Sequence, residues 1–227
     1  MMSANAPLTD QQRNAVMGMR TMYKSIVASI PLGTAESVDQ RARQPDPGSI
    51  PADVTVRVEI ALPSSQPPTL LDSRILKVPE RVPVYFYALH SDRAESESAA
   101  ELANTRVIFF IHGGGNIAGH PTQPPFLQFY AQLLRAVVSH SGDATASKKC
   151  VLIAPSYRLA TVPENAFPAA LQDLVAAYDY ILEKGYDASN IFFAGGSAGG
   201  NHGQYTPHPR PSHAIGGTDS ASQQRLC

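Results

Sequence analysis

The sequence predicts an α/β fold whose mostly parallel sheet is covered by helices on both faces. Three unbroken apolar runs, typical of strands buried on both faces, occupy residues 106–111, 150–157 and 190–196. Two segments with the apolar spacing of a helix lie between these runs, at 126–138 and 171–182. A glycine-rich sequence directly follows the first and the last run. Strands and helices that alternate in this way favour parallel βαβ units.

The residues before this region predict a looser arrangement of elements. A capping-box pattern precedes helically spaced apolar residues and predicts a helix over 9–30. Residues 41–52 are a polar connector that contains proline. Alternating valines predict a half-buried strand at 54–60, and 82–89 predicts a second strand. The acidic segment 91–105 has no period and is interpreted as a solvated loop.

The end of the sequence differs in composition from the part before it. Pro207, Pro209 and Pro211 interrupt a segment without apolar period, which predicts a disordered tail over 203–227. We therefore expect an N-terminal helix and connector at 1–50 and a partial α/β domain at 51–202.

Composition argues against several classes of protein. Lys and Arg number 18 and Asp and Glu number 19, so the net charge of −1 favours no nucleic-acid partner. No apolar run approaches the roughly 20 residues that span a membrane. The N-terminus has no secretory signal, although its helix faintly resembles a mitochondrial presequence. Cys150 and Cys227 do not suggest a disulfide framework. We expect a cytoplasmic protein without cofactor, whose oligomeric state the sequence does not indicate.

Two glycine motifs carry the functional prediction. The strand 106–111 runs into His112 and three glycines, Gly113, Gly114 and Gly115. Backbone N–H groups of such a loop can approach an oxyanion without interference from Cβ atoms. The last strand runs into G-G-S-A-G, which holds Ser197 in a nucleophile elbow.

Residues 82–201 resemble the hormone-sensitive-lipase-like branch of the α/β-hydrolase fold. The stretches that carry the resemblance are FFIHGGGNIAGH, SYRLATVPENAFPAALQDL and FFAGGSAGGN, in the family's order. Ser156 and Gly196 stand where the family commonly has aspartate. The resemblance implies an ester hydrolase with Ser197 as nucleophile and small-molecule ester substrates. It also implies oxyanion donors at Gly113, Gly114, Gly115 and Ala198, and a loop-shaping role for His112.

Each motif also has a simpler interpretation. Gly113, Gly115 and Ala118 match a dinucleotide-binding loop, but the next strand lacks the acidic residue that such a loop needs. Ser197 could be a small residue in an ordinary turn. We expect structural roles for Tyr157, Arg158 and Asp173, and no metal site at the histidines.

A serine nucleophile needs an acid and a histidine that follow it in the chain in this fold. The only acidic residue after Ser197 is Asp219, and His202, His208 and His213 all precede it. The sequence therefore predicts the N-terminal part of an α/β-hydrolase fold, truncated after the elbow and inactive as it stands. The alternative is a non-catalytic protein of the same fold that binds small ligands, as a receptor does.

Overall fold

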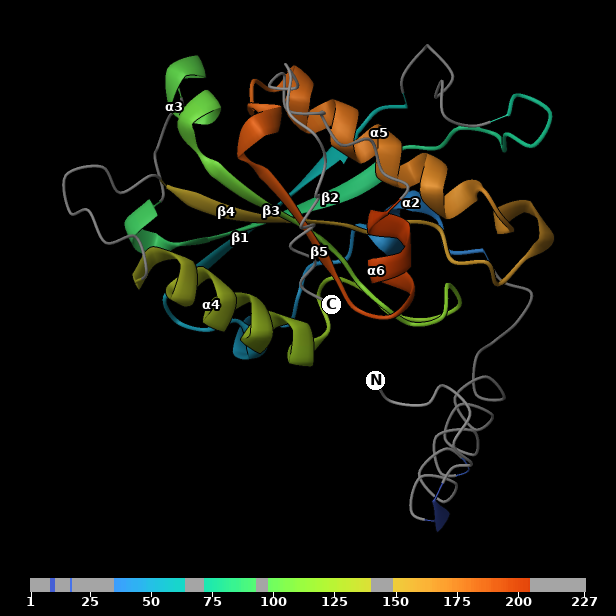
Figure 1. Ribbon diagram of the computed structural model, residues 1–227, viewed down its shortest axis with the longest axis horizontal. Helices are drawn as coiled ribbons and strands as arrows, with labels where there is room; N and C mark the ends of the chain where they lie inside the picture. Colours follow the sequence, from blue (N-terminus) through green and yellow to red (C-terminus); the bar gives the residue numbers. More distant parts are fainter. Residues whose placement is uncertain are drawn as a thin grey trace, which may run out of the picture.

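The computed structural model describes residues 9, 10, 17, 35–63, 72–92, 98–139 and 149–204 (Figure 1). Within this part, five strands form one sheet in the order β1-β2-β4-β3-β5. The strands are β1 (Val54–Ala61), β2 (Val82–Leu89), β3 (Arg106–Ile111), β4 (Cys150–Pro155) and β5 (Ile191–Gly195). Most of the predicted N-terminal helix, and the tail from residue 205 on, lie outside the described residues.

The sheet is antiparallel at one side and parallel at the other. β2 pairs antiparallel with both β1 and β4, whereas β3 pairs parallel with β4 and β5. The three parallel strands coincide with the three unbroken apolar runs, so the prediction of a mostly parallel, doubly covered sheet is confirmed.

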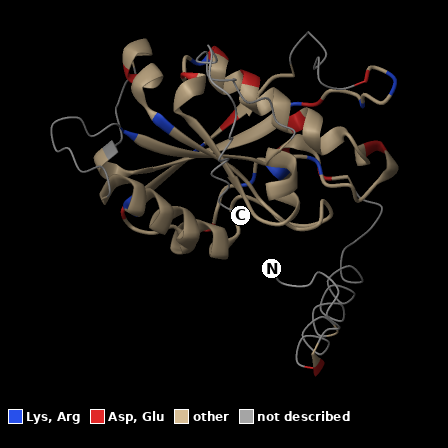
Figure 2. Ribbon diagram, viewed as in Figure 1, with Lys and Arg blue, Asp and Glu red and all other residues tan. Residues whose placement is uncertain are grey.

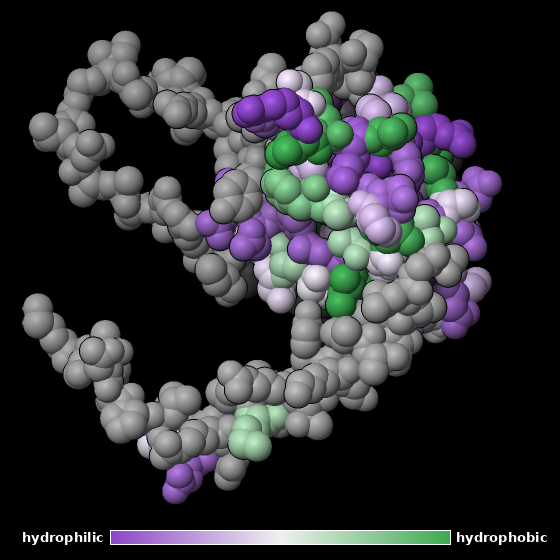
Figure 3. Space-filling model, turned by 90° about the vertical axis from the view of Figure 1, so that its right-hand side faces the viewer, coloured by the Kyte–Doolittle hydropathy of each residue, from purple (hydrophilic) through white to green (hydrophobic). Residues whose placement is uncertain are grey.

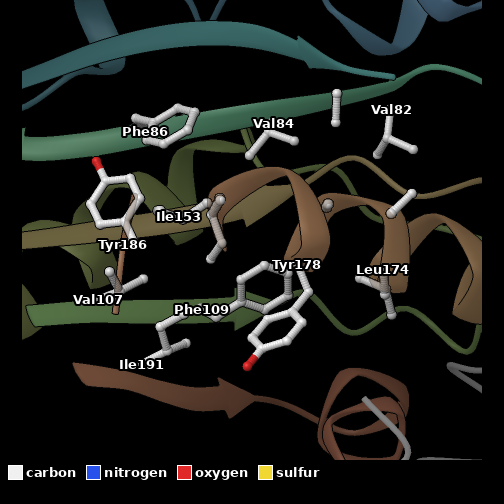
Figure 4. Close-up of a cluster of buried hydrophobic side chains, with 14 of the residues drawn as sticks. Val82, Val84, Phe86, Val107, Phe109, Ile153, Leu174, Tyr178, Tyr186 and Ile191 are labelled. Carbon is white, nitrogen blue, oxygen red and sulfur yellow. The ribbon is translucent and has the colours of Figure 1, made fainter. Parts of the chain in front are cut away.

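One long helix covers each face of the sheet. α4 (Pro124–Ser139) and α5 (Ala169–Glu183) lie on opposite sides of it (Figure 1). Because side chains alternate along a strand, Ile108 and Phe110 pack toward α4, and Val107 and Phe109 pack toward α5. Figure 4 shows the cluster on the α5 side, which joins residues of all five strands to that helix.

Short helices occur where the sequence predicted loops. The segment interpreted as a solvated loop contains a 3₁₀ turn, η2 (His90–Asp92), and a helix, α3 (Ala99–Asn104). The loop interpretation was wrong for α3 because Ser98 and Glu101 form a complete capping box at its start. Likewise, η1 (Pro47–Ser49) interrupts the polar connector, and α2 (Val38–Arg41) ends where that connector begins.

A helix also begins directly after the turn that follows β5. α6 (Ala198–Gly203) occupies a glycine-rich stretch to which the apolar pattern of the sequence assigns no helix. Three glycines give this segment a low intrinsic helix propensity, but packing against the end of β3 stabilises the helix despite it. Two further 3₁₀ turns, η3 (Pro163–Asn165) and η4 (Ala188–Asn190), precede α5 and β5.

The parallel strands bring both glycine motifs to one edge of the sheet. β3 and β5 are neighbours, and Ile111 pairs with Gly195 at their carboxyl ends. The chain after each strand therefore emerges at the same place.

Charged residues of both signs are dispersed over the described elements (Figure 2). The side that includes the start of α5 mixes apolar and hydrophilic surface (Figure 3).

Candidate active site

Ser197 occupies a strained turn between β5 and α6. Its φ of 54° and ψ of −120° lie in a region that residues with a side chain rarely adopt. The residue is exposed to solvent. A sharp turn of this kind lifts the side chain off the end of the sheet, as a nucleophile elbow requires.

Close packing at the elbow depends on residues without a Cβ. A Cβ on Gly195 would lie 2.7 Å from the carbonyl oxygen of Ile111, and a Cβ on Gly199 would collide with the same oxygen. Glycine at both positions therefore lets β5 and α6 approach the end of β3. Gly196 has open space around it, so nothing near it requires glycine.

The loop after β3, residues 113–119, is called the glycine loop below. Gly114 and Gly115 have φ values of 125° and 63°, which glycine adopts readily. The carbonyl oxygen of Gly114 accepts hydrogen bonds from the N–H groups of Ile117 and Ala118, at 3.1 and 3.0 Å. These bonds fold the loop into a tight turn. A Cβ on Gly113 would lie 3.4 Å from the Cβ of Ser197, so the loop packs directly on the elbow.

Several backbone donors near Ser197 are unpaired. In the described part of the chain, the N–H groups of Gly114, Gly115 and Ala198 have no hydrogen-bond acceptor. Gly114, Gly115 and Ser197 are all exposed. Unpaired N–H groups from the glycine loop and from the start of α6 can bind an anionic oxygen.

His112 lies behind the glycine loop and does not face solvent. Its ring is 1% exposed and stacks on Tyr157, with ring centroids 4.2 Å apart. Its Nδ1 lies 2.8 Å from the carbonyl oxygen of Gly113, to which it can donate a hydrogen bond. Burial lowers the pKa of His112 to about 4, so the ring is neutral near pH 7. The Tyr157 hydroxyl donates to the carbonyl oxygen of His112 at 2.8 Å and fixes the start of the loop.

A buried ion cluster supports the loop after β4. Arg158 Nη2 and Nε bind Asp173 of α5 at 2.8 and 3.0 Å, and both residues are almost fully buried. This contact ties loop to helix, the structural role that the sequence predicts for these residues. Sequence reasoning missed Arg41, whose Nη1 reaches Ser156 O at 2.9 Å and Asp173 at 3.3 Å. The capping box formed by Ser37 and Gln40 was a signal for α2, which carries Arg41.

The histidine of α6 contacts the glycine loop rather than the serine. His202 Nε2 lies 2.6 Å from Oδ1 of Asn116, a residue with a φ of 64°. Among the described residues, the Ser197 hydroxyl has no hydrogen-bond partner.

No group of three or more His, Cys, Asp or Glu in the described part of the chain could hold a metal ion. No helix there is long and apolar enough to cross a membrane.

Comparison with known proteins agrees with this geometry. Residues 108–203, which run from β3 through α6, match the α/β-hydrolase fold family. With the strained serine turn and the glycine loop beside it, this match assigns this part of the chain to the α/β-hydrolase fold. The three spaced motifs of the chain resemble those of the hormone-sensitive-lipase-like branch of that fold.

The similar curated proteins are named as esterases or hydrolases. The chain is 36% identical over 94 residues to an acetyl-hydrolase of Streptomyces hygroscopicus, covering 41% of this chain and 26% of the relative. It is 35% identical over 106 residues to probable carboxylesterase 6 of Arabidopsis thaliana, covering 43% of this chain and 28% of the relative. The matched stretch therefore spans about a quarter of the length of these relatives.

Solved structures with a similar arrangement include an esterase from the bacterial hormone-sensitive lipase family. That likeness has 20% identity and a TM-score of 0.43, and covers 87% of this chain and 51% of the esterase. A homologue of hormone-sensitive lipase from a metagenome library gives 24% identity and a TM-score of 0.42, covering 81% of this chain and 48% of the homologue.

Proposed function

We propose that this chain carries the nucleophile and the oxyanion hole of a carboxylic ester hydrolase. Ser197 is the nucleophile, and the N–H groups of Gly114, Gly115 and Ala198 are the oxyanion donors, with Gly113 packed beneath them. The observation that supports this most directly is the exposed Ser197 in strained geometry, beside donors that have no other acceptor. His112 shapes the loop and does not act as a base, because it is buried and bonded to Gly113.

The chemistry follows from this arrangement. The Ser197 oxygen attacks the acyl carbon of a small or medium ester, and the carbonyl oxygen becomes an oxyanion bound by the loop donors. Collapse of this intermediate expels the alcohol and leaves an acyl-serine, which water then hydrolyses. Each donor to the oxyanion contributes roughly 3 kcal/mol in such sites.

A base must take the proton from Ser197 for rapid turnover. His112 and His202 both bond elsewhere, to Gly113 and to Asn116. We therefore propose that this chain by itself polarises an ester carbonyl but does not turn esters over at an ordinary rate. The alternative of a ligand-binding receptor gains no support from the relatives, whose names describe hydrolases.

Covalent labelling with an alkyl fluorophosphonate tests the proposal without requiring turnover. The labelling is run in mildly alkaline buffer, because the proposal assigns no protein base: the Ser197 oxygen attacks phosphorus, fluoride leaves and hydroxide takes the hydroxyl proton. Peptide mass spectrometry should find the label on Ser197 in clear excess over the exposed serines Ser139 and Ser189. Ser197→Ala should remove it. Equal labelling of all three serines would contradict the proposal.

A further inference from the structure

One side-chain hydrogen bond joins the two parts of the site. His202 Nε2 of α6 lies 2.6 Å from Oδ1 of Asn116 in the glycine loop. An amide oxygen only accepts, so Nε2 carries the proton and donates it. His202 is half-buried, and burial lowers its pKa, so it remains neutral near pH 7.

Asn116 is bound on two sides. It directly follows Gly115 and has a φ of 64°, a conformation that asparagine tolerates better than most residues. Its carbonyl oxygen accepts from the N–H of Ala160, at 2.6 Å, in the loop after β4. Its side chain accepts from His202. The backbone and the side chain of one residue therefore connect the glycine loop to two other segments.

His202 also packs on the residues that fix the start of the loop. Its ring lies 5.7 Å from the ring of Tyr157 in an edge-on arrangement, and Tyr157 stacks on His112. These ring contacts thus lead from His202 of α6 through Tyr157 to His112, at the base of the glycine loop.

We propose that His202 and Asn116 are positioning residues that clamp the glycine loop to the elbow helix. The proposal rests on the proposed function above, in which Gly114 and Gly115 act together with Ala198. These donors belong to different segments, and glycines have no side chains that could hold the segments together. An oxyanion hole works only when its donors are already in place. The His202–Asn116 hydrogen bond fixes the separation between the loop donors and the helix donor.

Amide hydrogen exchange of the full 227-residue chain tests this clamp. The reporters are the N–H groups of Ile117 and Ala118, which bond to Gly114, and of Ala160, which bonds to Asn116. His202→Leu removes the Nε2–H donor and leaves an apolar side chain of similar size. Asn116→Gly removes the acceptor but keeps the left-handed backbone. Each change should speed exchange of these amides roughly three- to tenfold, as expected for loss of one hydrogen bond.

Coupling and rescue separate positioning from general loss of stability. The double variant should exchange no faster than either single variant, because both lose the same bond. His202→Gln, which retains an N–H donor, should restore slow exchange. Asn201→Ala changes an exposed neighbour on α6 and should have no effect. Unchanged exchange in His202→Leu, or uniformly faster exchange that includes β3 and β4, would overturn the proposal.

The rate of fluorophosphonate labelling provides the functional readout. His202→Leu and Asn116→Gly should slow labelling of Ser197 by a similar factor, and His202→Gln should recover it. The exchange result does not depend on Ser197 chemistry. If the two variants show coupled exchange but Ser197 is not labelled selectively, the His202–Asn116 contact is supported and the ester hydrolase function is contradicted.

Discussion

Gly113 lies directly beneath Ser197. A Cβ on Gly113 would come within 2.7 Å of the carbonyl oxygen of Gly196 and 3.4 Å of the Ser197 Cβ. The loop that carries the proposed oxyanion donors and the turn that carries the proposed nucleophile are thus in direct backbone contact. Any side chain at Gly113 must push them apart.

Gly113→Ala should therefore slow labelling of Ser197 by a fluorophosphonate by about 10²-fold, the effect of losing one oxyanion donor. Gly203→Ala is the matched control, because a Cβ there meets nothing within 4 Å. Time courses of intact mass give both rates. Equal rates for Gly113→Ala and Gly203→Ala would show that the two segments do not act together.

The chain as given should not hydrolyse p-nitrophenyl butyrate at an ordinary enzymatic rate. Loss of the base that activates a serine costs about 10⁶ in turnover, although an oxyanion hole alone retains some rate. Release of p-nitrophenol should stay near background and should change little in Ser197→Ala. Robust turnover that Ser197→Ala abolishes would reveal a base outside the described residues.

Folding stability should fall in mild acid because two histidines are buried neutral. Burial lowers the pKa of both His112 and His120 to about 4, from an ordinary value of 6.5. The unfolded chain binds these protons at a higher pH than the folded chain does. Stability is therefore fully present above pH 6.5 and declines as the pH falls from 6.5 toward 4. The loss is about 1.4 kcal/mol per pH unit for each group.

Urea unfolding between pH 4 and pH 7 measures this loss. The imidazole of His120 accepts from the Thr122 N–H at 3.2 Å and reaches the carbonyl oxygen of Arg41 at 2.8 Å. His120→Asn should reduce the slope of stability against pH by about half. A free energy of unfolding that stays constant down to pH 5 would disprove the prediction.

Arg41 should stabilise the fold far more than its neighbour Arg43. The Arg41 guanidinium is 2% exposed and bonds to Ser156 and Asp173, whereas Arg43 is half-exposed and pairs with Glu36. Arg41→Met removes one partner of a buried ion cluster, which should cost about 3 kcal/mol. Arg43→Met should change the free energy of unfolding by no more than about 0.5 kcal/mol. Equal losses in the two variants would show that burial of Arg41 contributes little.

The outer edge of β5 should promote self-association of this chain. In the described sheet β5 pairs only with β3, and Phe192 is 60% exposed on a strand without charge or proline. Strands with these properties are not protected against edge-to-edge pairing. Phe192→Lys should shift the chain toward monomer in analytical ultracentrifugation. Leu62→Lys, at another exposed apolar residue, should not. A wild-type monomer at all concentrations would refute the prediction.

The sequence by itself determined the strands, the long helices and the two glycine motifs. Apolar period and length distinguish strands such as 106–111 from helices such as α4, because burial on two faces or on one stripe leaves different patterns. The motifs and their order indicated the family and the residues proposed for the site. Short helices such as α3 and α6 were missed, since caps and packing rather than apolar period define them.

Only the tertiary structure decided which distant residues meet. No local pattern could indicate that Arg41 reaches Asp173, that Gly113 packs under Ser197, or that His202 bonds to Asn116. These contacts join residues that are more than 80 positions apart in the chain. They depend on the strand order, which places the ends of β3 and β5 side by side. Sheet order results from packing of the whole domain, and the chain does not encode it in any single segment.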